Sequence, residues 1–166
     1  MITKAIIPVA GLGTRMLPIT KSIEKCMLPV GTRPVIDYVV QDVVKAGIKD
    51  IYFVVGEQSS QLQSFYKDNI PLVAPLSGVT MHFITQPSMG GYGTSVPVGL
   101  CSQFIEEDES AVVIMGDQFY LRDDGGSNAE DLIELVSSKN LTAGLYGVQM
   151  PIHNIDSSIE KDEDDN

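Results

Sequence analysis

Residues 2–30 read ITKAIIPVAGLGTRMLPITKSIEKCMLPV and join a short apolar run to a loop rich in glycine, hydroxyl groups and cations. The run at residues 2–8 is typical of a buried strand, because a central parallel strand is covered on both faces and is apolar along most of its length. The segment at residues 8–30, called the glycine loop below, therefore starts at the end of a strand. Ligands of open α/β sheets bind at that edge.

Similar apolar runs recur along the chain and alternate with stretches of helical period. The pattern predicts further strands at residues 51–55, 79–84, 111–115 and 142–148, and helices at residues 35–45, 59–67, 94–105 and 128–138. Ser59, Thr94 and Asn128 are the predicted N-caps, and Gly47 is a suitable stop after the first helix. This alternation predicts an α/β fold with a parallel sheet covered by helices.

The length of 166 residues suits one domain. We expect that domain to span residues 1–151 and to be followed by an acidic tail or incomplete hairpin at residues 152–166. Cys26 and Cys101 have no metal-ligand spacing and are expected to be buried free thiols.

The charge balance argues against several classes of protein. With 22 acidic and 11 basic residues the formal net charge is −11, which disfavours general nucleic-acid binding. No apolar stretch is long enough to span a membrane, and the first residues lack the layout of a secretory signal. We therefore expect a soluble, cytoplasmic protein without a membrane partner. Composition leaves the oligomeric state open, a homo-oligomer included.

The glycine loop concentrates groups that bind anions. Gly11 and Gly13 allow backbone N–H groups to approach a ligand closely, and Thr14 adds a hydroxyl donor. Arg15, Lys21 and Lys25 are three of only eleven cations in the chain. The loop is therefore predicted to hold an anionic ligand.

Other glycine loops fit this segment less well. A redox dinucleotide fingerprint needs a third glycine where Met16 stands, and the phosphate loop of P-loop NTPases needs Gly-Lys-Ser/Thr, which the chain lacks. A solvated turn between a strand and a helix remains the plain alternative. It is weakened because cations recur after Pro18 and Pro29, which stiffen the loop instead of ending it.

The loop resembles the signature of the sugar-1-phosphate nucleotidyltransferases, G-x-G-T-R-x-x-P-x-T-x-x-x-x-K-x-x-x-P-V. The matching residues are Gly11, Gly13, Thr14, Arg15, Pro18, Thr20, Lys25, Pro29 and Val30. The surrounding residues are most similar to the bacterial UTP:glucose-1-phosphate uridylyltransferases. The resemblance implies a Rossmann-like three-layer sandwich of the nucleotide-diphospho-sugar transferase type. It also implies synthesis of a nucleotide sugar, UDP-glucose first, and pyrophosphate from a nucleoside triphosphate and a sugar 1-phosphate.

The same resemblance assigns roles to individual residues. Arg15 and Lys25 would be catalytic and lie on the phosphates. The implied nucleotide-binding residues are Ala10, Gly11, Leu12, Gly13, Thr14, Gln86 and Gly91. Gln86 and Gly91 would read the base, and a carboxamide suits that task because it offers both a donor and an acceptor. Asp117 would ligate Mg²⁺, which takes carboxylate, phosphate and water oxygens.

The resemblance weakens after residue 151. In the family the strand corresponding to residues 142–148 leads to a hairpin that residues 158–166 resemble. The Glu-Lys-Pro segment that follows it, with the sugar-phosphate lysine, and the second metal-binding Asp have no counterpart here, so the sequence has the pattern of a truncated member. A nucleotide-binding fragment without turnover is therefore an alternative, and so is a thymidylyl- or guanylyltransferase of the same family. Glu24 stands where a proline often precedes the motif lysine, and Cys26 stands where the uridylyltransferases usually have Glu.

Overall fold

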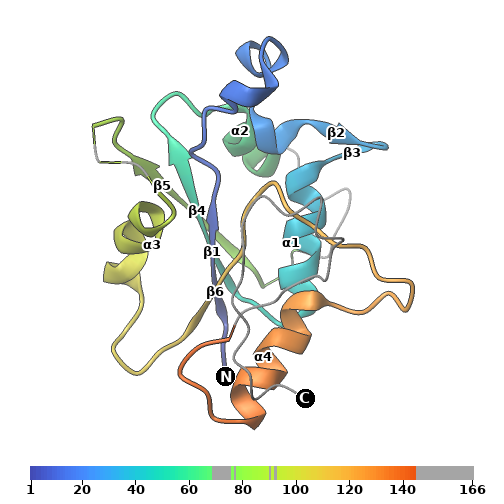
Figure 1. Ribbon diagram of the computed structural model, residues 1–166, viewed down its shortest axis with the longest axis vertical. Helices are drawn as coiled ribbons and strands as arrows, with labels where there is room; N and C mark the ends of the chain where they lie inside the picture. The colour runs from blue at the N-terminus through green and yellow to red at the C-terminus, as the bar shows by residue number, and fades with distance from the viewer. Residues whose placement is uncertain (69–75, 77, 90, 92, 145–166) are drawn as a thin grey trace, which may run out of the picture.

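The computed structural model describes residues 1–68, 76, 78–89, 91 and 93–144. Four strands form a parallel sheet in the order β5-β4-β1-β6, as Figure 1 shows. Their bounds are Lys4–Pro8 for β1, Asp50–Gly56 for β4, Thr80–Gln86 for β5 and Ala111–Val113 for β6. The predicted parallel α/β sheet is confirmed.

Four helices alternate with these strands. They are α1 (Val35–Lys45), α2 (Gln61–Asp68), α3 (Ser95–Cys101) and α4 (Asn128–Ser138), and a short 3-10 helix, Ser102–Phe104, extends α3. The predicted bounds of α1 and α4 are confirmed. Gly47 follows α1 with a φ of 84°, a left-handed conformation that favours glycine at this position.

The predicted N-cap of α4 is wrong by one residue, and the predicted start of α2 is wrong by two. Ser127, and not Asn128, caps α4, because its Oγ accepts a hydrogen bond from the Glu130 backbone N–H at 3.0 Å. Helix α2 begins at Gln61, two residues later than predicted. The Ser59 hydroxyl donates to Glu24 instead of accepting from the helix.

The alternating side chains of β1 divide the core into two layers. Ala5 and Ile7 are fully buried on the face covered by α1, α2 and α4. Ile6 points to the opposite face, where it packs with Tyr52 and Val54 of β4 and with Cys101 of α3. Figure 1 shows α3 on one side of the sheet and α1 and α4 on the other. The three-layer sandwich is thus confirmed. Each fully buried Ile or Phe contributes about 1.5 to 3 kcal/mol to the core.

Outside the sheet, one small ribbon closes the glycine loop. Strands β2 (Pro29–Val30) and β3 (Arg33–Pro34) pair in an antiparallel manner and lead directly into α1. Among the described residues, no helix has the length and apolar composition needed to cross a membrane. Of the predicted strand at residues 142–148, residues 142–144 have no regular structure, and residues 145–148 lie outside the described part. The predicted tail at residues 152–166 lies outside it as well.

Candidate nucleotide site at the carboxyl edge of the sheet

The predicted site residues lie along one edge of the parallel sheet. Gln86 ends β5 and is the register partner of Gly56 at the end of β4, and the glycine loop leaves the end of β1 next to it. Ala10 is close to Gly56, because a Cβ added to that glycine would lie 3.7 Å from the Ala10 carbonyl oxygen. Asp117 follows β6 on the other side of β1. Strand β5, which ends at Gln86, and strand β6, which precedes Asp117, are thus three strand spacings apart, roughly 14 Å.

Gly13 and Thr20 fold the glycine loop back on itself. Gly13 has a φ of 61°, and its carbonyl accepts a hydrogen bond from the Thr20 hydroxyl at 2.9 Å. A Cβ at position 13 would lie 2.8 Å from Thr20 Cγ2, so only glycine fits both the backbone angle and the space. By contrast, a Cβ at Gly11 would meet no atom within 4 Å. Gly11 therefore leaves open space beside the loop backbone.

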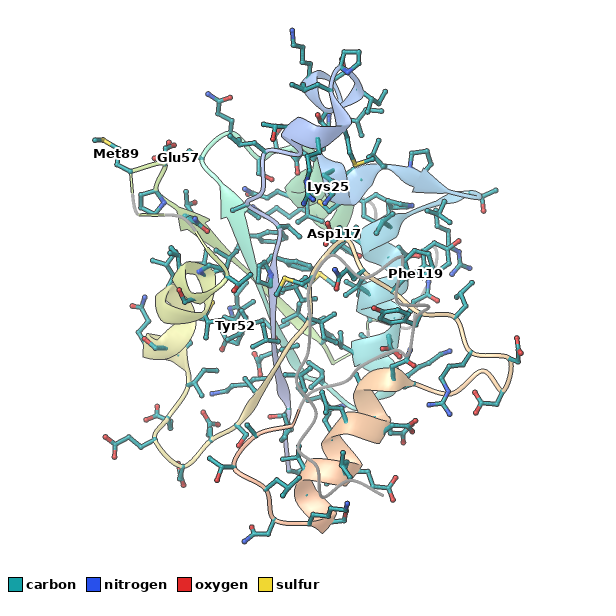
Figure 2. All side chains as sticks on the ribbon, viewed as in Figure 1. Lys25, Tyr52, Glu57, Met89, Asp117 and Phe119 are labelled. Atoms are coloured by element: carbon teal, nitrogen blue, oxygen red, sulfur yellow. The ribbon has the colours of Figure 1, made fainter. Side chains whose placement is uncertain are left out.

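Lys25 and Asp117 meet at this edge although they are 92 residues apart in sequence. The Lys25 ammonium group donates a hydrogen bond to the Asp117 carboxylate and forms an ion pair with it, and Figure 2 shows the two side chains side by side above the sheet. Each side chain is 32% exposed, so a ligand can reach both. In the structure, the lysine predicted to bind phosphate is therefore paired with the aspartate predicted to bind a metal.

Gly116 places Asp117 against β1. Beyond the end of β6, the Ile114 and Gly116 backbone N–H groups donate to the Ile6 and Pro8 carbonyls at 3.1 and 3.3 Å. Gly116 is buried, and a Cβ there would lie 2.2 Å from Val9 Cγ1. The close packing needs glycine, and it brings the following residue to the edge beside the glycine loop.

The other predicted residues lie at the same edge without tight contacts. Thr14 and Arg15 form a short exposed 3-10 helix, Thr14–Met16, and Leu12 is 83% exposed. Within the described chain Arg15 has no carboxylate partner. Gly91 lies between β5 and α3 with a φ of 98°. The roles of Gln86 and Gly91 in reading a base remain predictions.

The Asp117 carboxylate at this edge fits one class of metal. No cluster of three or more His, Cys, Asp or Glu side chains suited to a metal occurs within the described ranges. Mg²⁺ does not need such a cluster, because it commonly takes one or two carboxylates and completes its shell with phosphate oxygens and water. Asp117, partly exposed beside the glycine loop, is compatible with that mode.

Glu24 makes a contact that the sequence did not reveal. Its carboxylate accepts hydrogen bonds from the Ser59 hydroxyl at 2.7 Å and from the Ser60 and Gln61 backbone N–H groups at 2.6 and 2.8 Å, so it caps the N-terminus of α2. In return, the Glu24 backbone N–H donates to Gln61 Oε1 at 2.9 Å, and Gln61 Nε2 donates to the Ser22 carbonyl at 2.8 Å. The residue before Lys25 is therefore fixed to α2.

Both cysteines are buried free thiols, as predicted. Cys26 follows Lys25 and is 4% exposed in the core under α1. Burial raises the pKa of its thiol from 9.0 to about 12, so the group is a neutral, unreactive packing residue.

A cavity of about 550 Å³ lies elsewhere, between α1, β6 and α4. It shares no lining residue with the glycine loop. Residues 142–144 line one side of it, immediately before the undescribed segment. None of the predicted site residues lines the cavity, although Met115 and Gln118, which lie on either side of Asp117, do.

Known proteins similar to this chain agree on one family. Residues 4–153 match the family described as nucleotidyl transferase. A Methanocaldococcus jannaschii protein provisionally named a UTP–glucose-1-phosphate uridylyltransferase is 38% identical over 136 residues, which are 72% of this chain and 47% of that protein. A Streptococcus pyogenes serotype M1 protein named UTP–glucose-1-phosphate uridylyltransferase 2 is 34% identical over 131 residues, 70% of this chain and 43% of that protein.

Solved structures show the same relationship. The UTP-bound UGPase of Acinetobacter baumannii has a TM-score of 0.74 and 29% identity, covering 84% of this chain and 54% of that chain. A UDP-glucose pyrophosphorylase complexed with UDP-glucose has a TM-score of 0.73 and 26% identity, covering 84% of this chain and 55% of that chain. The chain spans about half the length of the curated relatives it matches. By its sequence and its fold, this chain belongs to the nucleotidyl transferase family.

Proposed function

We propose that this chain binds a nucleoside triphosphate, UTP first, along the carboxyl edge of its sheet, and that it serves the transfer of the nucleotidyl group to a sugar 1-phosphate. The observation that carries the proposal is the Lys25–Asp117 pair beside the glycine loop. A cation for phosphate and a carboxylate for Mg²⁺ meet there, at the loop whose glycines expose backbone donors. UDP-glucose and pyrophosphate would be the products.

The residues of the loop would act on the triphosphate by contact and charge. The open space at Gly11 allows phosphate oxygens to approach the backbone N–H groups of residues 10–14. Arg15, which has no carboxylate partner among the described residues, supplies a second cation. An oxygen of the sugar phosphate would attack the α-phosphorus while the bond to pyrophosphate breaks. Arg15 and Lys25 would then neutralise charge on the departing pyrophosphate.

A bound Mg²⁺ would add charge neutralisation on the phosphate oxygens, and Asp117 is the residue that would hold it. Lys25 is paired with this carboxylate in the structure. With Asp117 as the residue that holds the metal, the Lys25 ammonium group would be available to the phosphates. The two roles are therefore coupled through one ion pair.

Gln86 would determine which base is bound. Its carboxamide, at the end of β5, can donate to and accept from one base edge. UTP is preferred here because the relatives are named for it. Thymidylyl or guanylyl transfer would use the same edge.

A second candidate function, binding of the nucleotide without turnover, applies to these 166 residues tested on their own. An in-line transfer needs both reactants in place, and holding them can supply roughly 7 to 11 kcal/mol of the barrier. Only the triphosphate side is proposed within these residues. A pyrophosphate-release assay with UTP, glucose 1-phosphate and Mg²⁺ distinguishes the two candidates.

Calorimetric titration of UTP with Mg²⁺ tests the binding proposal. Arg15→Ala and Lys25→Ala should each raise the dissociation constant about ten- to a hundredfold, since a charge-assisted phosphate contact contributes about 1.5 to 3 kcal/mol. Lys139→Ala is the matched control, because Lys139 is an exposed lysine at the end of α4, away from the loop. Binding of NAD with no response to UTP would refute the proposal.

A further inference from the structure

The Glu24 carboxylate lies at the centre of a clamp between the glycine loop and α2. Four donors converge on it: the Ser59 hydroxyl, the Ser60 and Gln61 backbone N–H groups, and more distantly the Leu62 N–H at 3.4 Å. The first N–H groups of a helix have no partner within the helix, and its N-terminus favours negative charge. Glu24 therefore accepts hydrogen bonds from the N-terminal donors of α2, although it precedes them by more than 34 residues in the sequence.

The helix side of this clamp is anchored in the core. Leu62 is fully buried, and the Tyr66 ring stacks on Phe53 of β4 with ring centroids 5.6 Å apart. The first turn of α2 is thus fixed relative to the sheet. Gln61 strengthens the link, because its side chain bonds the backbone on both sides of Ile23.

Lys25 lies between two anchors as a result. Glu24 holds the preceding residue to α2, and Cys26 holds the following residue in the core. Lys25 is the first residue of the short 3-10 helix Lys25–Met27, and the Lys25 side chain reaches Asp117 from this position. A lysine side chain has many rotamers, so a fixed backbone origin reduces the entropy lost when the ammonium group binds a phosphate.

We infer that Glu24 is a positioning residue: by clamping the glycine loop to α2, it holds Lys25 where it contacts the triphosphate. The inference rests on the proposed nucleotide binding. It makes Gln61 the partner residue of the clamp. It also predicts the sign of an effect, because a carboxylate acting only through its charge would repel the triphosphate, whereas a clamp promotes binding.

Two neutral substitutions at position 24 separate the clamp from the charge. Glu24→Gln and Glu24→Ala remove the same charge, but glutamine keeps an oxygen that can accept from the Ser60 and Gln61 N–H groups. The dissociation constant for UTP with Mg²⁺ should rise about five- to thirtyfold in Glu24→Ala relative to Glu24→Gln, the equivalent of ordering one residue's backbone during binding. Equal or tighter binding by Glu24→Ala would overturn the inference.

A double-mutant cycle tests whether Glu24 acts through Lys25. The effect of Lys25→Ala should shrink in the Glu24→Ala background, because the lysine is then no longer held in place, whereas fully additive effects would overturn the inference. A loss of affinity in Lys25→Ala with none in Glu24→Ala would refute only the clamp. No loss in either variant would refute the proposed function and the clamp together.

A pair of glutamines on α2 provides a test that leaves Glu24 intact. Gln61→Ala removes both side-chain bonds to residues 22–24, and Gln63→Ala, on the same helix, removes only contacts within residues 59–67. Gln61→Ala should weaken UTP binding, and Gln63→Ala should leave it unchanged. Urea unfolding of every variant checks that binding is measured on folded protein. Equal UTP affinity of these two variants would overturn the inference.

Discussion

Replacing Asp117 with Asn should change UTP binding in opposite directions with and without Mg²⁺. The substitution keeps the size of the side chain and removes one negative charge. In the structure, Lys25 is bound to this carboxylate, so a triphosphate without metal must compete with Asp117 for the ammonium group. With metal, the same carboxylate is the proposed ligand.

The size of the metal-free effect follows from the exposure of the pair. A unit charge about 5 Å from a phosphate contributes on the order of 1 kcal/mol in a water-like dielectric and about 3 kcal/mol at an effective dielectric of 20. Both side chains are 32% exposed, which favours the lower value. Asp117→Asn should therefore bind metal-free UTP about fivefold more tightly. Its affinity in the presence of Mg²⁺ should decrease.

Calorimetric titrations of UTP in chelator and in Mg²⁺, at one fixed low ionic strength, measure both effects. Asp123→Asn is the matched control, because Asp123 is an exposed carboxylate in the turn that follows and removing it changes the net charge equally. A shift in the same direction under both conditions, or equal shifts in the two variants, would refute the reasoning.

Two further predictions concern the packing around the site. Gly116→Ala should lower the free energy of unfolding in urea by about 1 to 3 kcal/mol, because the new Cβ would lie 2.2 Å from Val9 Cγ1. Gly99→Ala in α3 is the control: its Cβ would meet no atom within 4 Å, and alanine should raise the free energy of unfolding by about 1 kcal/mol. The pKa of Cys26 is raised by burial from 9.0 to about 12, so the unfolded thiol ionises first and stability should fall as pH rises above 9, by roughly 1 kcal/mol at pH 10. Comparing urea unfolding of parent and Cys26→Ala across this pH range isolates the contribution, and a constant difference would contradict it.

Elements with a clear period could be predicted from the sequence. Helix α1 repeats its apolar residues at helical spacing and ends near Gly47, and β4 is apolar over five residues, so both were found. The three short 3-10 helices of the glycine loop, at Thr14–Met16, Ile19–Lys21 and Lys25–Met27, were not predicted. A single turn is too short to show a hydrophobic period.

The residues of the site were predicted in part, but the contacts between them were not, because those contacts join residues far apart in the sequence. Lys25 was identified from a cation-rich loop and the family signature, and Asp117 from the family resemblance at a strand end, but their ion pair depends on the order of strands in the sheet. Glu24 was noted only as a departure from a family pattern. Its partners are more than 34 residues away, and no local signal links them. Ser59 gave a misleading signal, because a serine before a helix usually accepts from that helix.

The pairing of β1 with β6 sets when the site can form during folding. Lys4 is the register partner of Ala111, so this contact closes a loop of more than 100 residues, whereas β1 reaches β4 at Asp50. Contacts between distant residues form slowly, because the entropy of closing the chain is lost before the contact stabilises anything. On a ribosome, the glycine loop emerges long before the acidic residue that meets it. Until that residue arrives, Lys25 lacks its Asp117 partner, and a nascent chain would present an ammonium group that the folded protein pairs with a carboxylate.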